Sequence, residues 1–212
     1  MASTINASTS AGGGIVQTAD ASGVLALQAA GTTIASVSST GVAVTGTFSA
    51  TGAFTPTTMG GSVITSATAQ ASTSGTAIDF TGIPSWVKRI TVMFAGFSTN
   101  STSSIIVQIG TSGGIETSGY LSGCIANSNG TATAGFIVST QAAATVNHGA
   151  MQISYFGSNS WISSSAIGYS DANGGAAAGG SKTLSATLDR VRITTVSGTA
   201  TFDAGSINIM YE

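Results

Sequence analysis

The sequence predicts an all-β protein in which an extended N-terminal segment precedes an antiparallel β-sandwich or barrel. Gly and small polar residues recur along the 212-residue chain, and apolar residues alternate with polar ones in its second part. Turn-forming clusters of Gly, Asn and Ser separate the alternating runs. No segment favours a helix, because the best candidate, 139–147 (STQAAATVN), is short and rich in Thr.

Residues 23–75 consist of short β-like pieces with small side chains and frequent Gly, including Thr-Gly steps at 40–41, 45–46 and 51–52. Such a segment has too little apolar bulk to be stable alone, but identical copies can bury it together. We interpret it as the shaft of a trimer, with a flexible linker as the alternative. Four apolar side chains are expected to point toward the trimer axis: Val42, Val44, Phe48 and Phe54.

Residues 76–212 change character, because large apolar side chains now recur with the two-residue period of a half-buried strand. This part is long enough to bury a sizeable core, whereas the part before it is not. The predicted inward faces are Ile90, Val92 and Phe94; Ile105, Val107 and Ile109; Met151, Ile153 and Tyr155; Val191 and Ile193; and Ile207, Ile209 and Tyr211.

Composition excludes several classes of protein. Only 6% of the residues are charged and the net charge is -2, which is the reverse of a disordered chain. The five basic residues are too few and too dispersed for a nucleic-acid partner. No apolar run is long enough to span a membrane, and the N-terminus, MASTINASTS, lacks the features of a signal peptide. We therefore expect neither membrane insertion nor export by the host.

No catalytic or metal site is evident, so we expect no enzyme and no cofactor. The carboxylates are isolated in sequence: Asp79, Glu116, Asp171, Asp189 and Asp203. A single His excludes a His-rich metal site, and a Cys-His nucleophile would have to join Cys124 to His148. The plainer interpretation is a buried small side chain for Cys124 and a polar loop residue for His148.

The two Trp residues receive different interpretations. Trp86 precedes a strand and is expected in the core. Trp161 is flanked by polar turn residues, so it is either an exposed aromatic that stacks on sugar or a buried anchor at a subunit interface. Loops carry the variable chemistry of a β-sandwich, and the candidate receptor contacts are accordingly Asn159, Trp161, Asp171 and Asn173.

Four stretches resemble bacteriophage tail-fibre and related virion fibre proteins. They are MASTINASTSAGGGIVQTADASGVLALQAAGTT, SSTGVAVTGTFSATG, TGIPSWVKRITVMFAGFSTNSTS and the terminal FDAGSINIMYE. The likeness covers most of the chain and lies in local sequence and layout rather than in a catalytic signature.

The resemblance implies a homotrimeric virion protein with a docking segment (1–22), a slender β shaft (23–75) and a jelly-roll-like β-sandwich knob (76–212). We therefore expect a non-enzymatic short tail fibre on the phage particle, made in the bacterial host cytoplasm. Its expected partners are its own copies, other tail or capsid proteins, and a host-surface glycan or protein. The alternative is a capsid decoration protein, a head fibre or cement, that stabilises the particle without a receptor.

Overall fold

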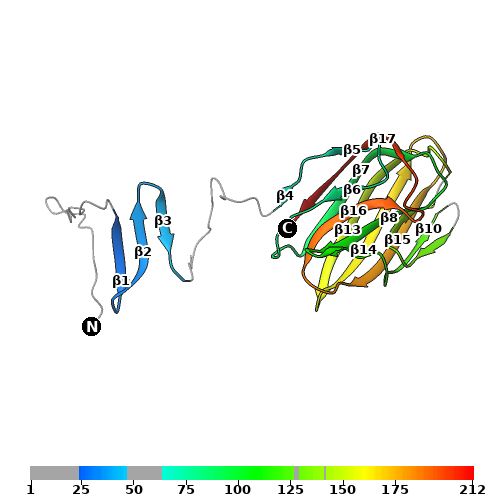
Figure 1. Ribbon diagram of the computed structural model, residues 1–212. Coiled ribbons are helices and arrows are strands. Elements are labelled where there is room, and N and C mark those ends of the chain that lie inside the picture. Colours follow the sequence, from blue (N-terminus) through cyan, green and yellow to red (C-terminus); the bar gives the residue numbers. More distant parts are fainter. Residues whose placement is uncertain (1–23, 47–63, 127–128, 141) are drawn as a thin grey trace. The chain divides into compact units, whose positions relative to one another are not determined.

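The computed structural model describes residues 24–46, 64–126, 129–140 and 142–212. The chain divides into two units, residues 1–59 and 60–212. Every regular element in the described residues is a β-strand (Figure 1), which confirms the all-β prediction. Within these residues, no helix has the length and apolar character needed to cross a membrane.

The described part of the first unit is a three-stranded antiparallel meander. Its strands are β1 (Leu25–Ala29), β2 (Thr32–Ser38) and β3 (Gly41–Val44). A two-residue turn joins β1 to β2, and both Ala30 and Gly31 have positive φ, as the twist of a tight hairpin requires. Gly41, at φ 131°, opens β3 after the second turn. The Thr-Gly step at 40–41 therefore marks a turn between strands.

One face of this meander is apolar. The register pairs Leu25 with Val37 and Val37 with Val42, and side chains opposite one another across strands share a face. All three are exposed, and Val42 keeps 67% of its surface within this chain. Whether Val42 and Val44 enter a trimer core stays a prediction. The other predicted core residues, Phe48 and Phe54, and the docking segment 1–22 lie outside the described residues.

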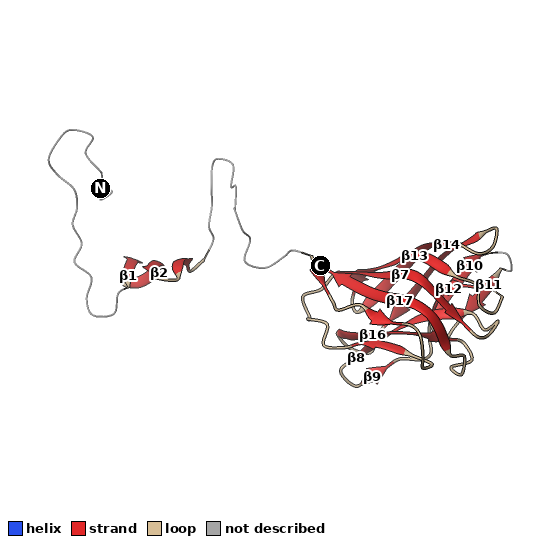
Figure 2. Ribbon diagram, turned by 90° about the horizontal axis from the view of Figure 1, so that it is seen from above, coloured by secondary structure: helices blue, strands red, loops and turns tan. Residues whose placement is uncertain are grey.

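The second unit contains two antiparallel sheets. The larger has nine strands in the order β11-β10-β15-β14-β13-β7-β17-β4, with β5 also paired to β17; the smaller has the order β12-β8-β16-β6, with β9 paired to β8. Figure 2 shows β7, β13 and β17 of the larger sheet on one side and β8, β9 and β16 of the smaller sheet on the other.

Four pairs of consecutive strands form antiparallel hairpins in the described part of this unit: β8–β9, β10–β11, β13–β14 and β14–β15. The bounds of the strands follow. In the larger sheet they are β4 (Thr65–Ser66), β5 (Gln70–Ala71), β7 (Arg89–Thr99), β10 (Leu121–Ile125), β11 (Gly130–Ala132), β13 (Asn147–Gly157), β14 (Ser160–Tyr169), β15 (Gly175–Thr183) and β17 (Phe202–Tyr211). In the smaller sheet they are β6 (Ile78–Phe80), β8 (Ile105–Thr111), β9 (Gly114–Ile115), β12 (Phe136–Ser139) and β16 (Leu188–Thr195).

The core lies where the inner faces of the two sheets meet. The predicted alternation is confirmed in β7, β13, β16 and β17, whose inward residues are buried in one cluster. At the centre of β7 this cluster holds Ile90, Val92 and Phe94, while Thr91 and Met93 face outward. Burial of such side chains is the main favourable contribution to folding.

Strand β8 departs from its predicted pattern, because all seven of its residues are buried. Its second face is also covered: Ile106 packs in a separate cluster with Cys124, Ala132 and Ile137. The Gln108 Nε2 donates a hydrogen bond to the Ala134 carbonyl at 2.8 Å. The chain between β10 and β12 thus covers a face that the sequence suggested was half-exposed, and the expected burial of Cys124 is confirmed.

The boundary predicted at residue 75 is wrong, because residues 64–75 belong to the second unit. Strands β4 and β5 both pair with β17. The Ser72 amide also donates to the Gly205 carbonyl at 2.9 Å, and its buried hydroxyl donates to the Ala204 carbonyl at 2.7 Å. Two-residue strands are too short to show a hydrophobic period, so no alternation in the sequence predicts them.

Truncation tests this boundary. A chain beginning at residue 60 should melt like the second unit of the full-length protein, whereas a chain beginning at residue 76 loses the strands that cover the β17 edge. The lost hydrogen bonds and the uncovered edge should cost at least about 2 kcal/mol, or roughly 5 °C in Tm. Differential scanning calorimetry of both chains measures the difference. Equal melting temperatures would show that β4 and β5 add nothing to stability.

Candidate functional site

Trp161 is not the exposed sugar-stacking residue that the sequence allowed. It lies in β14 rather than in a loop, and only 3% of its surface is exposed. Alternation along β14 turns it toward the smaller sheet, where its ring meets that of Tyr155 edge-on at 5.3 Å between centroids. Because its own chain buries it, its burial does not require a subunit interface.

Asn159 occupies the hairpin turn between β13 and β14. Gly157 pairs with Ser160, which leaves Ser158 and Asn159 as a two-residue turn. Both have positive φ, 49° and 60°, as in the type I′ turns that suit twisted hairpins. The Asn159 carbonyl accepts a hydrogen bond from the Leu184 amide at 3.0 Å. Asn159 is half-buried. The turn conformation and the hydrogen bond from Leu184 together hold its backbone in place.

Asp171 and Asn173 are exposed in the turn that follows β14. One carboxylate oxygen of Asp171 accepts a hydrogen bond from the Val146 amide at 2.9 Å, which anchors this turn. Asn159 and Asp171 flank the two ends of the ten-residue β14, so roughly 30 Å separates them. The structure therefore does not bring the four predicted contact residues into one surface.

A small recess lies beside the turn that holds Asn159. Its volume is about 70 Å³, and its lining includes Lys88, Tyr155, Asn159 and Trp161. The Lys88 ammonium stands 4.2 Å from the centroid of the Tyr155 ring, a cation–π geometry. The Trp161 Nε1 is buried and has no hydrogen-bond partner among the described residues. An indole N–H can only donate, so this buried donor is left without an acceptor among the described residues.

The charges around the fold set Lys88 apart. Each of the other four basic side chains has a carboxylate partner: Arg89 with Glu212, Lys182 with Glu116, Arg190 with Asp189 and Arg192 with Asp79. Within the described residues, Lys88 has none. No acidic residue lines the recess. The recess is therefore electropositive and rich in donors.

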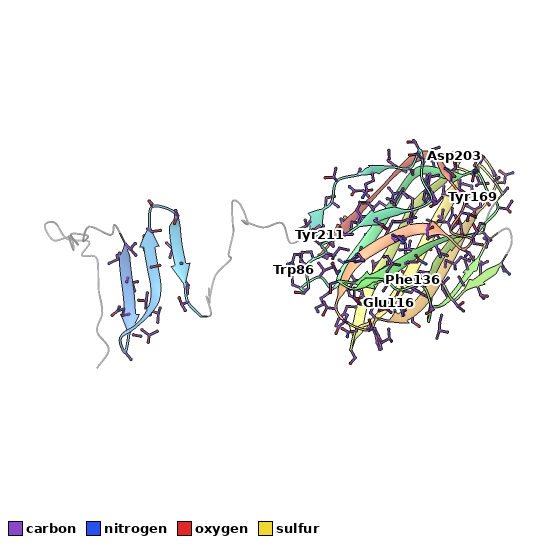
Figure 3. The ribbon with its side chains drawn as sticks, in the orientation of Figure 1. Trp86, Glu116, Phe136, Tyr169, Asp203 and Tyr211 are labelled. Atoms are coloured by element: carbon purple, nitrogen blue, oxygen red, sulfur yellow. The ribbon has the colours of Figure 1, made fainter. Side chains whose placement is uncertain are left out.

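Trp86 was expected in the core, and this prediction is wrong. It is 53% exposed and lies in the turn before β7, where the Val87 amide donates to the Pro84 carbonyl. Its ring is tilted against that of Tyr211 with 6.1 Å between centroids. Figure 3 shows Trp86 and Tyr211 together at one end of the unit and Tyr169 toward the other. The exposed Trp86 and the half-buried Tyr211 thus mark the end at which β7 begins.

A larger hollow, about 700 Å³ in volume, lies over β10, β11 and β15. Its walls are mainly glycine and alanine, including Gly123, Ala177 and Gly179, and none of its lining residues is charged. Specific small-molecule sites combine an apolar wall with a few convergent polar groups. The polar side chains that line this hollow, Asn129 and Thr131, are uncharged, and its small apolar walls suit contact with another surface.

The catalytic pair considered from the sequence does not form. Cys124 is buried in the cluster with Ile106, Ala132 and Ile137, whereas His148 is exposed and contacts the Ser170 hydroxyl at 3.2 Å. The neighbouring Asp171 carboxylate is bonded to the Val146 amide rather than to this His. Among the described residues, no three His, Cys, Asp or Glu side chains are grouped so as to hold a metal ion.

Comparison of the chain with models of known protein families, with curated proteins and with solved structures gives no match. The functional interpretation therefore rests on the geometry described above and on the resemblance in local sequence to virion fibre proteins.

The most buried ion pair joins Lys182 to Glu116 at 2.6 Å, with 8% and 22% of the two side chains exposed. Burial alone would raise the pKa of Glu116, but hydrogen bonds from Lys182 and Ser185 together hold it below its usual value. The Lys182 ammonium also lies 5.4 Å from the centroid of the buried Tyr120 ring. This cluster joins β15 to the segment after β9, which is a structural role.

The pH dependence of stability tests that role. A carboxylate with a lowered folded pKa contributes stability above about pH 4.5, and this is lost as the pH falls through the folded pKa. Glu116→Gln leaves a buried ammonium unpaired and should cost about 2 kcal/mol at neutral pH. The difference from the unmodified protein should be smaller at pH 3 than at neutral pH, because the Glu116 carboxylate is increasingly protonated as the pH falls.

Asp79→Asn is the matched control, because it breaks a more exposed pair with Arg192 and should cost at most about 1 kcal/mol. Urea unfolding at both pH values measures the two variants. If Glu116→Gln costs no more than Asp79→Asn at neutral pH, the cluster is not a stabilising contact.

Proposed function

We propose that this protein is a non-enzymatic structural protein of a bacteriophage particle. It forms a short homotrimeric tail fibre that docks on the particle through its N-terminal segment. Its C-terminal β-sandwich, a jelly-roll-like knob, contacts the host surface. The observation that carries the proposal is that the apolar face of the N-terminal meander has no cover among the described residues, whereas the C-terminal unit has a core of its own.

The meander needs a cover because a single small sheet is marginally stable in water. Its five large apolar side chains on the paired rows remain exposed: Leu25, Leu27, Val37, Val42 and Val44. Residues 24–46 carry no charge that would oppose association. Complete burial of a Val or Leu side chain contributes roughly 1.5–3 kcal/mol, so copies of the chain around one axis gain several kcal/mol each.

The C-terminal unit supports a recognition role through its layout. Its strands form a rigid scaffold, and its connecting turns lie at both ends of the sandwich. At one end the exposed Trp86 packs against Tyr211 and lies next to the donor-rich recess, since Ser85 and Val87 line this recess. Aromatic rings and donors are the groups with which proteins hold sugars.

Capsid decoration is the second candidate, and the outer face of the larger sheet favours it. Across β10, β14 and β15 this face carries no charged side chain, and it exposes Leu121, Ile125 and Ile162. An extended uncharged face suits contact with another protein better than contact with a glycan. A decoration protein would use this face against the capsid and would bind no receptor.

Trimer formation is tested by light scattering, which should give a mass near three times the 20.6 kDa of one chain. Val42→Asp should dissociate the trimer, because a carboxylate would have to be buried against the neighbouring copies. Ala43→Asp is the control, since adjacent strand residues point to opposite faces. A monomeric unmodified protein at micromolar concentration would contradict the proposal, as would a Val42→Asp protein that remains trimeric.

Binding to host cells separates the two candidates. A tail fibre labelled with a fluorophore should bind host cells saturably, because the receptor sites are finite in number, whereas a decoration protein should not bind. Electron cryomicroscopy of intact particles gives the position of the protein independently. A position on the capsid together with no cell binding would replace the tail-fibre proposal with the decoration role.

A further inference from the structure

We infer that the recess beside Asn159 binds a carboxylate, and that the carboxylate belongs to an acidic sugar of the host surface. The assignment of the sugar to the host surface rests on the proposed function, whereas the preference of the recess for a carboxylate does not. Three properties of the recess carry the inference: an unpaired cation, an orphaned buried donor and a size that admits only a small group.

The cation is Lys88, the basic residue without a carboxylate partner in the described part of the chain. Its ammonium lies 4.2 Å from the centroid of the Tyr155 ring, and this contact favours one direction of the exposed side chain before a ligand binds. The Lys88 carbonyl accepts a hydrogen bond from the Tyr155 amide at 2.8 Å, which ties the two residues together through the backbone as well. A charged donor fixed in place is suited to an anionic acceptor.

The orphaned donor is the Trp161 indole N–H. Burial of a polar group without a partner costs about 1–3 kcal/mol, and such groups are rare in folded proteins. Trp161 also packs against Tyr155, so the indole and the Lys88 ammonium contact the same phenol ring. An anion in the recess would meet the ammonium and lie beside the indole, because both residues line it.

The size and lining of the recess select the ligand. About 70 Å³ accommodates a carboxylate and its adjoining carbon but not a whole sugar ring, which would remain at the mouth. The Asn159 amide and the hydroxyls of Ser85 and Thr187 add neutral donors, while no acidic side chain lines the walls to repel an anion. The recess is therefore built for the acidic end of a larger molecule.

Nuclear magnetic resonance of the ¹⁵N-labelled full-length protein tests the inference directly. The chain has two Trp residues and hence two indole N–H signals, which Trp86→Phe assigns. Glucuronate and acetate, titrated to tens of millimolar at constant ionic strength, should shift the Trp161 signal saturably, whereas glucose should not. A Trp161 signal that no carboxylate moves would overturn the inference, because the N–H would then simply hold water.

Lys88→Met should weaken glucuronate binding about tenfold or more, since it removes the charged donor and keeps an apolar stem over Tyr155. Arg89→Met is the matched control, because it removes the same charge at the next residue. The Arg89 side chain is paired with Glu212 and does not line the recess. An unchanged amide spectrum establishes that each variant is folded. Equal binding by Lys88→Met and Arg89→Met would overturn the inference.

Competition on host cells separates this inference from the proposed function. If glucuronate displaces the labelled protein from cells and acetate does so more weakly, the recess recognises an acidic sugar. Glucuronate binding without any cell binding would support the site and contradict the host-surface role. Cell binding that persists in Lys88→Met and in saturating glucuronate would support the role and contradict the site.

Discussion

The fold depends on one constraint: the apolar face of a β-sheet must be covered. The C-terminal unit meets it within the chain, because the inner faces of the larger and smaller sheets bury Ile90, Val92 and Phe94 of β7 together with the facing residues of β8 and β16. The N-terminal meander has the same kind of apolar face, with Val37 and Val42 opposite one another, but no second layer covers it among the described residues. The proposal of a trimer follows from applying one physical rule to both units.

The few charges of the chain act over short distances. A surface of Ser, Thr and Gly provides little long-range electrostatic attraction, so each ionic contact is local. Pairs such as Arg89 with Glu212 and Arg192 with Asp79 join segments far apart in the sequence. Against that background a cation without a partner is informative. Lys88 lies at the end of the sandwich, where the cover of the core ends and the buried Trp161 comes close to solvent.

Much of the fold could be predicted from the sequence because period-two alternation records which face is buried, and β7, β13, β16 and β17 follow it. The failures have physical causes. Alternation cannot reveal a second cover, so β8 appeared half-exposed although it is buried on both faces. Serine signals a turn by composition, yet small side chains also fit the inner face of β14, so Trp161 was assigned to a loop. The recess could not be predicted, since whether Lys88 is paired depends on contacts with distant residues.

Trp161 illustrates how fold and site are coupled. Its position in the alternation of β14 turns the ring into the core, so the ring is not exposed for stacking on a ligand. The same orientation leaves the indole N–H without an acceptor among the described residues. The adjacent turn fixes Asn159 in the left-handed region, and the Leu184 amide holds that turn against the neighbouring hairpin. Donors positioned by packed strands require little ordering when an acceptor arrives. A fold that carries few charges can in this way still present a specific polar site, because rigidity of the surrounding sheets compensates for the small number of polar groups.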